Sequence, residues 1–204
     1  TSWLYLLMPM TYVLREAEMP ILPAGHADIR ILHFSDLHLT PARKSEIADI
    51  KSFASLKPDL VISTGDFLAH MDAVPVALDA LEPLLDTPGL FVFGSNDYYA
   101  PKPKNPLKYL LPDHGERVHG EDLPWPLLDL GLQARGWKNL NHHRATITIN
   151  GTTIEARGTD DAHLEFDDYS LVAGFPDICD IAIGVTHAPY LRILKGMAED
   201  GLDA

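Results

Sequence analysis

The first residues suited to metal chemistry are an aspartate and a histidine that follow an apolar run. Within residues 29–40 this run predicts a buried strand that stops at Ser35, and Asp36 and His38 come directly after it. Side chains two residues apart in extended backbone point the same way, so this carboxylate and this imidazole can converge on one point. Such a pair suits zinc, manganese or iron. The Asp-x-His pattern is common, and its meaning depends on the rest of the chain.

Three further apolar runs end in possible ligands, and small residues beside them let the backbone approach a bound group. These ligands are Asp66 at the end of 59–66, Asn96 after 90–93 and His187 after 181–186. In open α/β sheets, ligands bind just beyond the carboxyl ends of the strands. The four endings therefore predict one shared pocket.

The elements that must position these residues alternate between strand and helix. Residues 42–56 and 72–85 carry apolar side chains at helical spacing, and each stretch separates two of the first three strands. This order predicts a largely parallel sheet with crossover helices, and therefore an α/β fold. His33 alternates with apolar neighbours in the first strand, so we expect it to be packed or hydrogen-bonded in the core.

The second half of the chain changes to a period of two. Residues 145–150 alternate, and Asn150-Gly151 predicts a hairpin turn with residues 152–157 as the returning strand. A short helix is expected before it at 126–137, and a helix at 190–199 after the last strand. Asp160 and Asp161 follow the hairpin and lie either near the pocket or, as such pairs more often do, at a solvated turn.

Two stretches differ from this pattern, namely the lead-in at 1–28 and residues 98–126. The second is rich in proline, and loops of this length are usually lids or binding loops, so we expect it to cap the pocket. In the first, residues 3–14 are apolar but shorter than the roughly 20 that a bilayer span needs. We expect an edge strand there and keep a membrane-anchor remnant as the alternative.

Composition limits the partners. The 204 residues are 46% hydrophobic, enough for one domain with its own core, conceivably with a small insertion. The net charge is −13, from 16 Lys and Arg against 29 Asp and Glu, which repels nucleic acid, so nucleic acid is not an expected partner. The single cysteine, Cys179, allows no intrachain disulfide. We expect a cytoplasmic or peripherally membrane-associated protein.

The ordered blocks SDLH, TGDFL, FGSND and VTHAP resemble the signature of the calcineurin-like metallophosphoesterases, from about Ile29 to His187. That signature runs Asp-x-His, Gly-Asp, Gly-Asn-His-Asp/Glu, a lone His and finally Gly-His-x-His. The segments between these blocks, including YYAPKPKNP and GTDDAHL, are similar to those of a bacterial branch of membrane-associated and UDP-2,3-diacylglucosamine-pyrophosphatase-like enzymes.

The resemblance implies a four-layer α-β-β-α sandwich over residues 29–204 and two divalent transition metal ions, Mn, Fe or Zn. It implies that Asp36 and His38 bind the first metal, that Asp66 bridges both, and that Asn96 and His187 bind the second. A hydroxide between the metals then attacks a phosphomonoester, phosphodiester or pyrophosphate. The implied substrate is a small-molecule or lipid-headgroup phosphoester.

One departure lies at residues 94–97, where Gly-Ser-Asn-Asp replaces Gly-Asn-His-Asp. Strict alignment makes Ser95 the ligand, whereas a one-residue shift makes Asn96 the ligand with Asp97 beside it. We prefer Asn96, because a serine hydroxyl is a poor neutral donor to these cations. We include Asn96 and Asp97 among the catalytic candidates. The usual histidine is absent, and His70 is our candidate replacement, with an inconsequential loop histidine as the alternative.

The second departure is the absence of the final Gly-His-x-His before Ala204. We expect the chain to be a fragment whose sandwich lacks its C-terminal strands. If the chain is complete, one histidine for each metal is missing. The alternative function is then a catalytically impaired remnant that binds metal or phosphate, and a weaker alternative is a metal-free structural domain.

Overall fold

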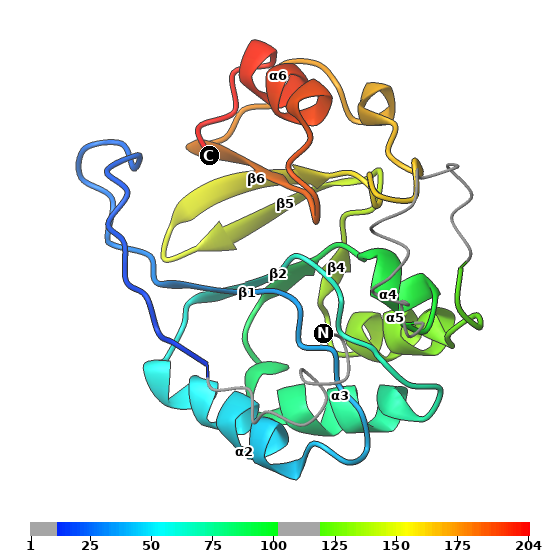
Figure 1. Ribbon diagram of the computed structural model, residues 1–204. Coiled ribbons are helices and arrows are strands. Elements are labelled where there is room, and N and C mark those ends of the chain that lie inside the picture. The colour runs from blue at the N-terminus through cyan, green and yellow to red at the C-terminus, as the bar shows by residue number, and fades with distance from the viewer. Residues whose placement is uncertain (1–11, 102–118) are drawn as a thin grey trace.

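Two β-sheets packed face to face form the centre of the fold (Figure 1). The computed structural model describes residues 12–101 and 119–204. The first sheet is parallel, with the strands in the order β1 (Ile31–Phe34), β2 (Leu60–Ser63), β3 (Gly89–Phe91) and β4 (Lys138–Asn139). In the second sheet, β6 (Thr152–Gly158) pairs antiparallel with β5 (Arg144–Ile149) and parallel with β7 (Ile181–Val185).

Helices cover the outer faces of both sheets (Figure 1). On the first sheet lie α2 (Lys44–Ser52), continued by η1 (Phe53–Leu56), α3 (Ala73–Leu81), continued by η2 (Glu82–Leu84), and α5 (Trp125–Ala134). On the second sheet lie η4 (Tyr169–Leu171) and α6 (Leu191–Glu199), and a single turn, α4 (Ser95–Tyr98), follows β3. The layers are therefore helix, sheet, sheet and helix, as expected for an α/β sandwich.

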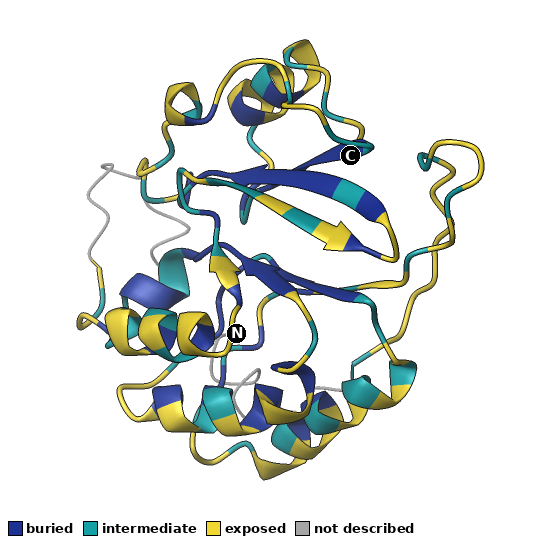
Figure 2. Ribbon diagram, turned by 180° about the vertical axis from the view of Figure 1, so that it is seen from behind, coloured by how far each residue is buried: buried dark blue, intermediate teal, exposed yellow. Residues whose placement is uncertain are grey.

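The alternation of strand side chains creates two separate cores. On β2, Leu60 and Ile62 face the second sheet, where they join residues such as Ile154 and Ile183, whereas Val61 faces the helices. Figure 2 shows the same pattern, with burial concentrated on the strands and on the sheet-facing sides of the helices. Each fully buried aliphatic side chain contributes about 1.5–3 kcal/mol, and this packing keeps the strand ends in register.

The helix α5 ends where the sequence predicts, close to Gly136. This glycine has a φ of +87°, and the backbone N–H groups of Gly136 and Trp137 donate to the carbonyls of Gln133 and Leu132, which is a Schellman motif. The motif directs Trp137 into the core, where its indole N–H donates to the Thr87 carbonyl at 3.1 Å. The Trp137 ring then lies directly over Gly89 of β3.

A polar layer attaches α6 to the second sheet. The buried Arg157 of β6 pairs with Glu155. It also donates to the carbonyl of Val172 at 2.9 Å and to that of Gly174 at 2.5 Å. Asp200, directly after α6, lies 3.4 Å from Arg157 and accepts from the Tyr169 hydroxyl at 2.7 Å. These contacts position the β7–α6 connection, which carries His187.

The expectation of a buried first strand was wrong. β1 is an edge strand with a neighbour on one side only, and Ile31 is 40% exposed. His33 forms a hydrogen bond with the Thr64 hydroxyl at 3.1 Å, but it is exposed and does not belong to a core. The second strand ends at Ser63, earlier than expected, because Gly65 and Asp66 have positive φ and turn the chain away.

Two predictions fall largely outside the described residues. They are the edge strand or anchor at 3–14 and the middle of the 98–126 lid. The described part of the lead-in, 12–28, contains neither helix nor strand. The two ends of the lid are tied together, because Ala100 N–H donates to Glu121 O and Leu123 N–H donates to Tyr98 O, both at 2.8 Å. Within 12–101 and 119–204, no helix has both the length and the apolar character needed to cross a bilayer.

We expect Gly89→Ala to lower the free energy of unfolding by about 1–3 kcal/mol, as overpacking does. A Cβ there would lie 2.2 Å from the Trp137 ring, and the hydrogen bond to Thr87 prevents the ring from moving aside. Urea unfolding followed by tryptophan fluorescence measures this. Gly131→Ala in α5 is the control, because its Cβ meets only the flexible Leu78 side chain of α3. Equal stability of the two variants would contradict the packing described.

Candidate metal centre

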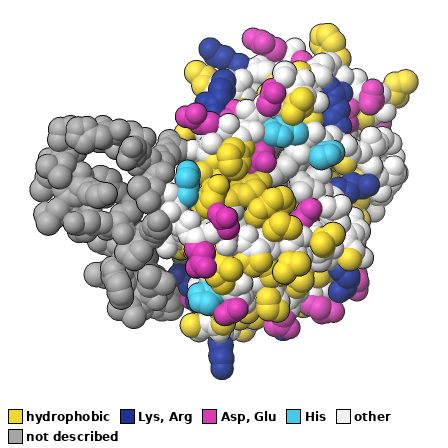
Figure 3. Space-filling model, turned by 90° about the vertical axis from the view of Figure 1, so that its right-hand side faces the viewer, with side chains coloured by type: hydrophobic (Ala, Val, Ile, Leu, Met, Phe, Trp, Pro, Cys, Tyr) yellow, Lys and Arg dark blue, Asp and Glu magenta, His cyan; other side chains and the backbone are white. Residues whose placement is uncertain are grey.

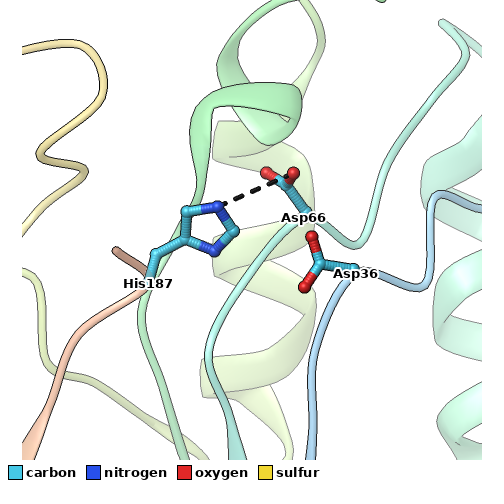
Figure 4. Close-up of side chains that lie close together, drawn as sticks. All are labelled: Asp36, Asp66 and His187. Carbon is cyan, nitrogen blue, oxygen red and sulfur yellow. Dashed lines mark ion pairs between the residues drawn. The ribbon is translucent and has the colours of Figure 1, made fainter. Parts of the chain in front are cut away.

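The carboxyl ends of β1, β2 and β7 bring together three side chains able to bind a metal (Figure 4). Asp36, Asp66 and His187 each offer one ligand atom, and these atoms all lie within 4.8 Å of one another. His187 Nε2 is 3.7 Å from Asp66 Oδ2. Figure 3 views the molecule from the side on which β1 and β2 end, where histidines and carboxylates lie beside apolar side chains. The predicted convergence of the strand ends is therefore present.

His38 lies beside the same group. Its Nε2 is 3.6 Å from Asp36 Oδ1 and 3.7 Å from Asp66 Oδ2. The carboxylate and imidazole of the Asp-x-His pattern thus converge, although the backbone there is not the extended strand assumed from the sequence. His38 consequently lies close to two of the other predicted ligands, Asp36 and Asp66.

Backbone strain is concentrated at these residues. Asp36, His38 and Asp66 have φ values of 57°, 43° and 57°, in the left-handed region that side chains other than glycine rarely adopt. Such conformations cost about 1–3 kcal/mol each and persist only where the surroundings impose them. Here the two strand-end loops are joined, since the N–H groups of Asp36 and His38 donate to the carbonyls of Gly65 and Asp66, both at 2.9 Å.

Asp97 fixes the Asp66 loop from the other side. Its carboxylate is buried and accepts four backbone N–H groups, at distances of 2.7 to 3.1 Å. Their donors are Asp66, Phe67, Leu68 and Gly94. Burial and the charge of Asp66 raise the pKa of Asp97 to about 7, while the backbone donors oppose that shift. The contacts make Asp97 a positioning residue, and its catalytic role remains a prediction without support from them.

Asn96 reaches the centre through two contacts with Asp66. Its backbone N–H donates to Oδ1 at 2.8 Å, and its side-chain Nδ2 donates to Oδ2 at 2.6 Å. The amide nitrogen therefore faces the carboxylate. Binding of a metal by Asn96 requires the amide to turn so that its oxygen takes that place.

His187 has one nitrogen anchored and one available. Its Nδ1 lies 2.6 Å from the Thr64 carbonyl oxygen, so Nδ1–H donates to it and Nε2 keeps its lone pair toward Asp66. Metal-bound histidines are commonly oriented in this way. Gly94 makes the close approach possible, because a Cβ at this position would lie 2.3 Å from Asp66 Oδ1 and 2.6 Å from His187 Cε1.

The electrostatics of the centre favour a cation. The hydrogen bond from His38, opposed by burial, lowers the pKa of Asp36 to about 2. Burial works to lower the pKa of His38, but the Asp36 hydrogen bond and the charges of Asp66 and Asp97 outweigh it and raise the pKa. Carboxylate oxygens and imidazole nitrogens are suitable ligands for Mn, Fe or Zn. The donor set thus fits the divalent metals expected from the sequence.

The side chain of His70 contacts Asp72. Its Nδ1 accepts from the Asp72 N–H at 3.1 Å and lies 3.7 Å from the Asp72 carboxylate, and half of its side chain is exposed. These contacts match the alternative of a loop histidine. A catalytic role for His70 remains a prediction that no described contact supports.

The loop after β6 supplies residues whose importance the sequence left open. Asp160 accepts from the Tyr98 hydroxyl at 2.7 Å, and Asp161 is fully buried, with its Oδ1 lacking a hydrogen-bond partner. The ring of His163 packs edge-on against that of His187, with the centroids 5.9 Å apart. The sequence could have indicated these residues by their position alone, because their loop follows the carboxyl end of β6, a strand parallel to β7.

Comparison with known families agrees with this geometry. Residues 29–195 match the family model of the calcineurin-like phosphoesterases. The chain belongs to the calcineurin-like phosphoesterase family. A search of curated proteins gives no match. The family match covers Asp36, Asp66 and His187, which form the candidate metal site of this calcineurin-like phosphoesterase.

We expect Asp66→Asn to weaken Mn²⁺ binding by at least tenfold, because it removes a carboxylate charge that lies 3.7 Å from the imidazoles of both His38 and His187. Isothermal titration calorimetry measures the affinity and the stoichiometry. Asp72→Asn is the matched control, since Asp72 is an exposed carboxylate six residues along the same loop. Unchanged Mn²⁺ affinity in Asp66→Asn would rule out this centre as the metal site.

We expect Asp97→Asn to lower the free energy of unfolding by about 2–4 kcal/mol. The amide keeps one acceptor oxygen, and its NH₂ group faces donors, so buried N–H groups lose their partner. Thermal unfolding measures the loss, with Asp129→Asn on α5 as the control, because Asp129 accepts only side-chain donors. A change in the free energy of unfolding below about 0.5 kcal/mol would contradict the role of Asp97 in holding these backbone N–H groups.

Proposed function

We propose that the protein hydrolyses phosphoester bonds with two divalent transition metal ions held by Asp36, His38, Asp66, Asn96 and His187. The observation that carries this proposal is the convergence of Asp36, Asp66 and His187 within 4.8 Å, in a chain that matches the family over residues 29–195. The strained backbone at three of these residues supports it, because strain of this kind is characteristic of functional sites.

The residues of this chain hold and orient the reacting groups. When bound, divalent metals polarise phosphoryl oxygens and lower the pKa of coordinated water. Thr64 fixes the tautomer and orientation of His187, and the backbone N–H of Asn96 holds Oδ1 of Asp66. Gly94 lets the Asp66 carboxylate and the His187 ring pack closely against the backbone, because a Cβ at this position would collide with both.

We propose a small-molecule or lipid-headgroup phosphoester as substrate, either a phosphomonoester, a phosphodiester or a pyrophosphate. The net charge of −13 argues against nucleic acid. Similarity of the segments between the motif blocks supports placing the protein in the branch of bacterial membrane-associated and UDP-2,3-diacylglucosamine-pyrophosphatase-like enzymes. Peripheral membrane association belongs to this proposal, and the exposed Val13, Leu14 and Met19 supply apolar surface for it.

A second candidate function is binding of metal or phosphate without turnover. Asn96 favours it, because its amide nitrogen faces Asp66 and an amide cannot act as a general acid toward the leaving group. The two functions differ in metal stoichiometry and in turnover.

Hydrolysis of bis-p-nitrophenyl phosphate and p-nitrophenyl phosphate with Mn²⁺ tests the proposal. We expect two equivalents of bound Mn²⁺, activity abolished by chelator and restored by metal, and at least a 100-fold loss of kcat in Asp66→Asn but not in Asp72→Asn. One bound equivalent without turnover would establish the second function instead. No metal bound at millimolar Mn²⁺ would contradict both.

A further inference from the structure

His163 is an exposed side chain that contacts the candidate metal centre and that the proposed function does not yet use. Its ring packs at 79° against the ring of the mostly buried His187, which belongs to the centre. The neighbours of these two histidines, Ala162 and Ala188, are both buried in the core under α6. The two histidines are therefore held side by side by the packing of the adjacent residues.

The turn that carries His163 is rigidly built. The buried Asp161 accepts from the Leu164 N–H at 2.9 Å through Oδ2, and its backbone carbonyl accepts from the Phe166 N–H at 3.0 Å. Glu165 has a φ of 60°, which closes the turn. His163 is exposed at the apex of this turn, so its position is fixed while its imidazole remains accessible.

Contacts on the far side orient the imidazole. His163 Nδ1 lies 3.3 Å from the Tyr190 hydroxyl, and the two rings meet edge-on at 5.6 Å. The Arg192 guanidinium covers the Tyr190 ring at 4.6 Å and is itself held by both oxygens of Asp167, at 2.8 and 2.6 Å. With the Tyr190 hydroxyl donating to Nδ1, the hydrogen of the neutral ring lies on Nε2, which is a free donor.

The charges near the centre make such a donor valuable. The centre and its surroundings are acidic, with the carboxyl groups of Asp36, Asp66, Asp97 and, in the loop after β6, Asp160 and Asp161. A phosphoryl group brings further negative charge. Arg192 is engaged by Asp167, so it supports Tyr190 and is not free for a ligand. An N–H donor beside His187 offsets repulsion that metal ions alone neutralise only in part.

We propose that His163 is a substrate-contacting residue that donates its Nε2–H to an oxygen of a phosphoryl group bound at the Asp36–Asp66–His187 centre. The ligand class is a phosphate mono- or diester, or inorganic phosphate. The inference rests on the proposed function for the location of the phosphoryl group, but it requires binding only and not turnover.

Calorimetric titration of the Mn²⁺-loaded full chain with inorganic phosphate tests this. We expect His163→Ala to weaken phosphate binding about tenfold, with bound Mn²⁺ and melting temperature unchanged, because a hydrogen bond to a charged group is lost. His163→Gln should recover part of the affinity, since its amide supplies an N–H donor. Tyr190→Phe, which keeps the imidazole but removes its hydroxyl partner, should weaken binding about two- to fivefold.

His143→Ala is the control, because His143 is exposed and its Nδ1 contacts only the carbonyl oxygen of Asn141. Equal phosphate affinity in His163→Ala and wild type would overturn the inference, as would absence of phosphate binding by the wild type. Loss of bound Mn²⁺ in His163→Ala would also overturn it, by making His163 a metal ligand. Phosphate binding without hydrolysis of either bis-p-nitrophenyl phosphate or p-nitrophenyl phosphate would refute the proposed function and leave this inference intact.

Discussion

The buried carboxylate of Asp97 is the constraint on which the metal centre depends. It gathers backbone N–H groups from the loops after β2 and β3, and these loops carry Asp66 and Asn96. Without that acceptor, the left-handed conformation of Asp66 would have little to maintain it, because each such residue is unfavourable by itself. A charge that touches no ligand atom thereby determines where the ligand atoms lie.

The same clustering of acidic groups explains why the site suits a cation. Folding brings Asp36, Asp66 and Asp97 together although their charges repel, and the fold tolerates this because imidazoles and backbone dipoles surround them. The backbone dipoles are permanent, whereas a metal can be bound and released. The protein therefore provides a preorganised cluster of negative charge whose electrostatic cost is recovered when a cation binds.

Much of the fold could be predicted from the sequence, because it depends on local regularities. The alternation around Asn150-Gly151 and the helical spacing in 72–85 both correspond to observed elements, β5–β6 and α3 with η2. The edge position of β1 could not be predicted, since an apolar run does not say how many neighbours a strand has. The convergence of Asp36, Asp66 and His187 followed from the rule that ligands gather at strand ends.

The remaining features of the site depend on contacts between distant segments. Four backbone N–H groups can donate to Asp97 only when separate loops are brought together. The same is true of the contact between His163 and His187. The orientation of the Asn96 amide is likewise set by Asp66, 30 residues away along the chain. Sequence spacing can suggest which residues meet, but not which atom of each faces the other.

The paired ends of the 98–126 segment have a consequence for how this protein can diversify. Hydrogen bonds between Ala100 and Glu121 and between Tyr98 and Leu123 close the base of the segment independently of what lies between them. Since the entropy of closing a loop grows only with the logarithm of its length, insertions or deletions above that base cost little. The length and sequence of this segment can therefore change without disturbing the residues of the candidate metal centre.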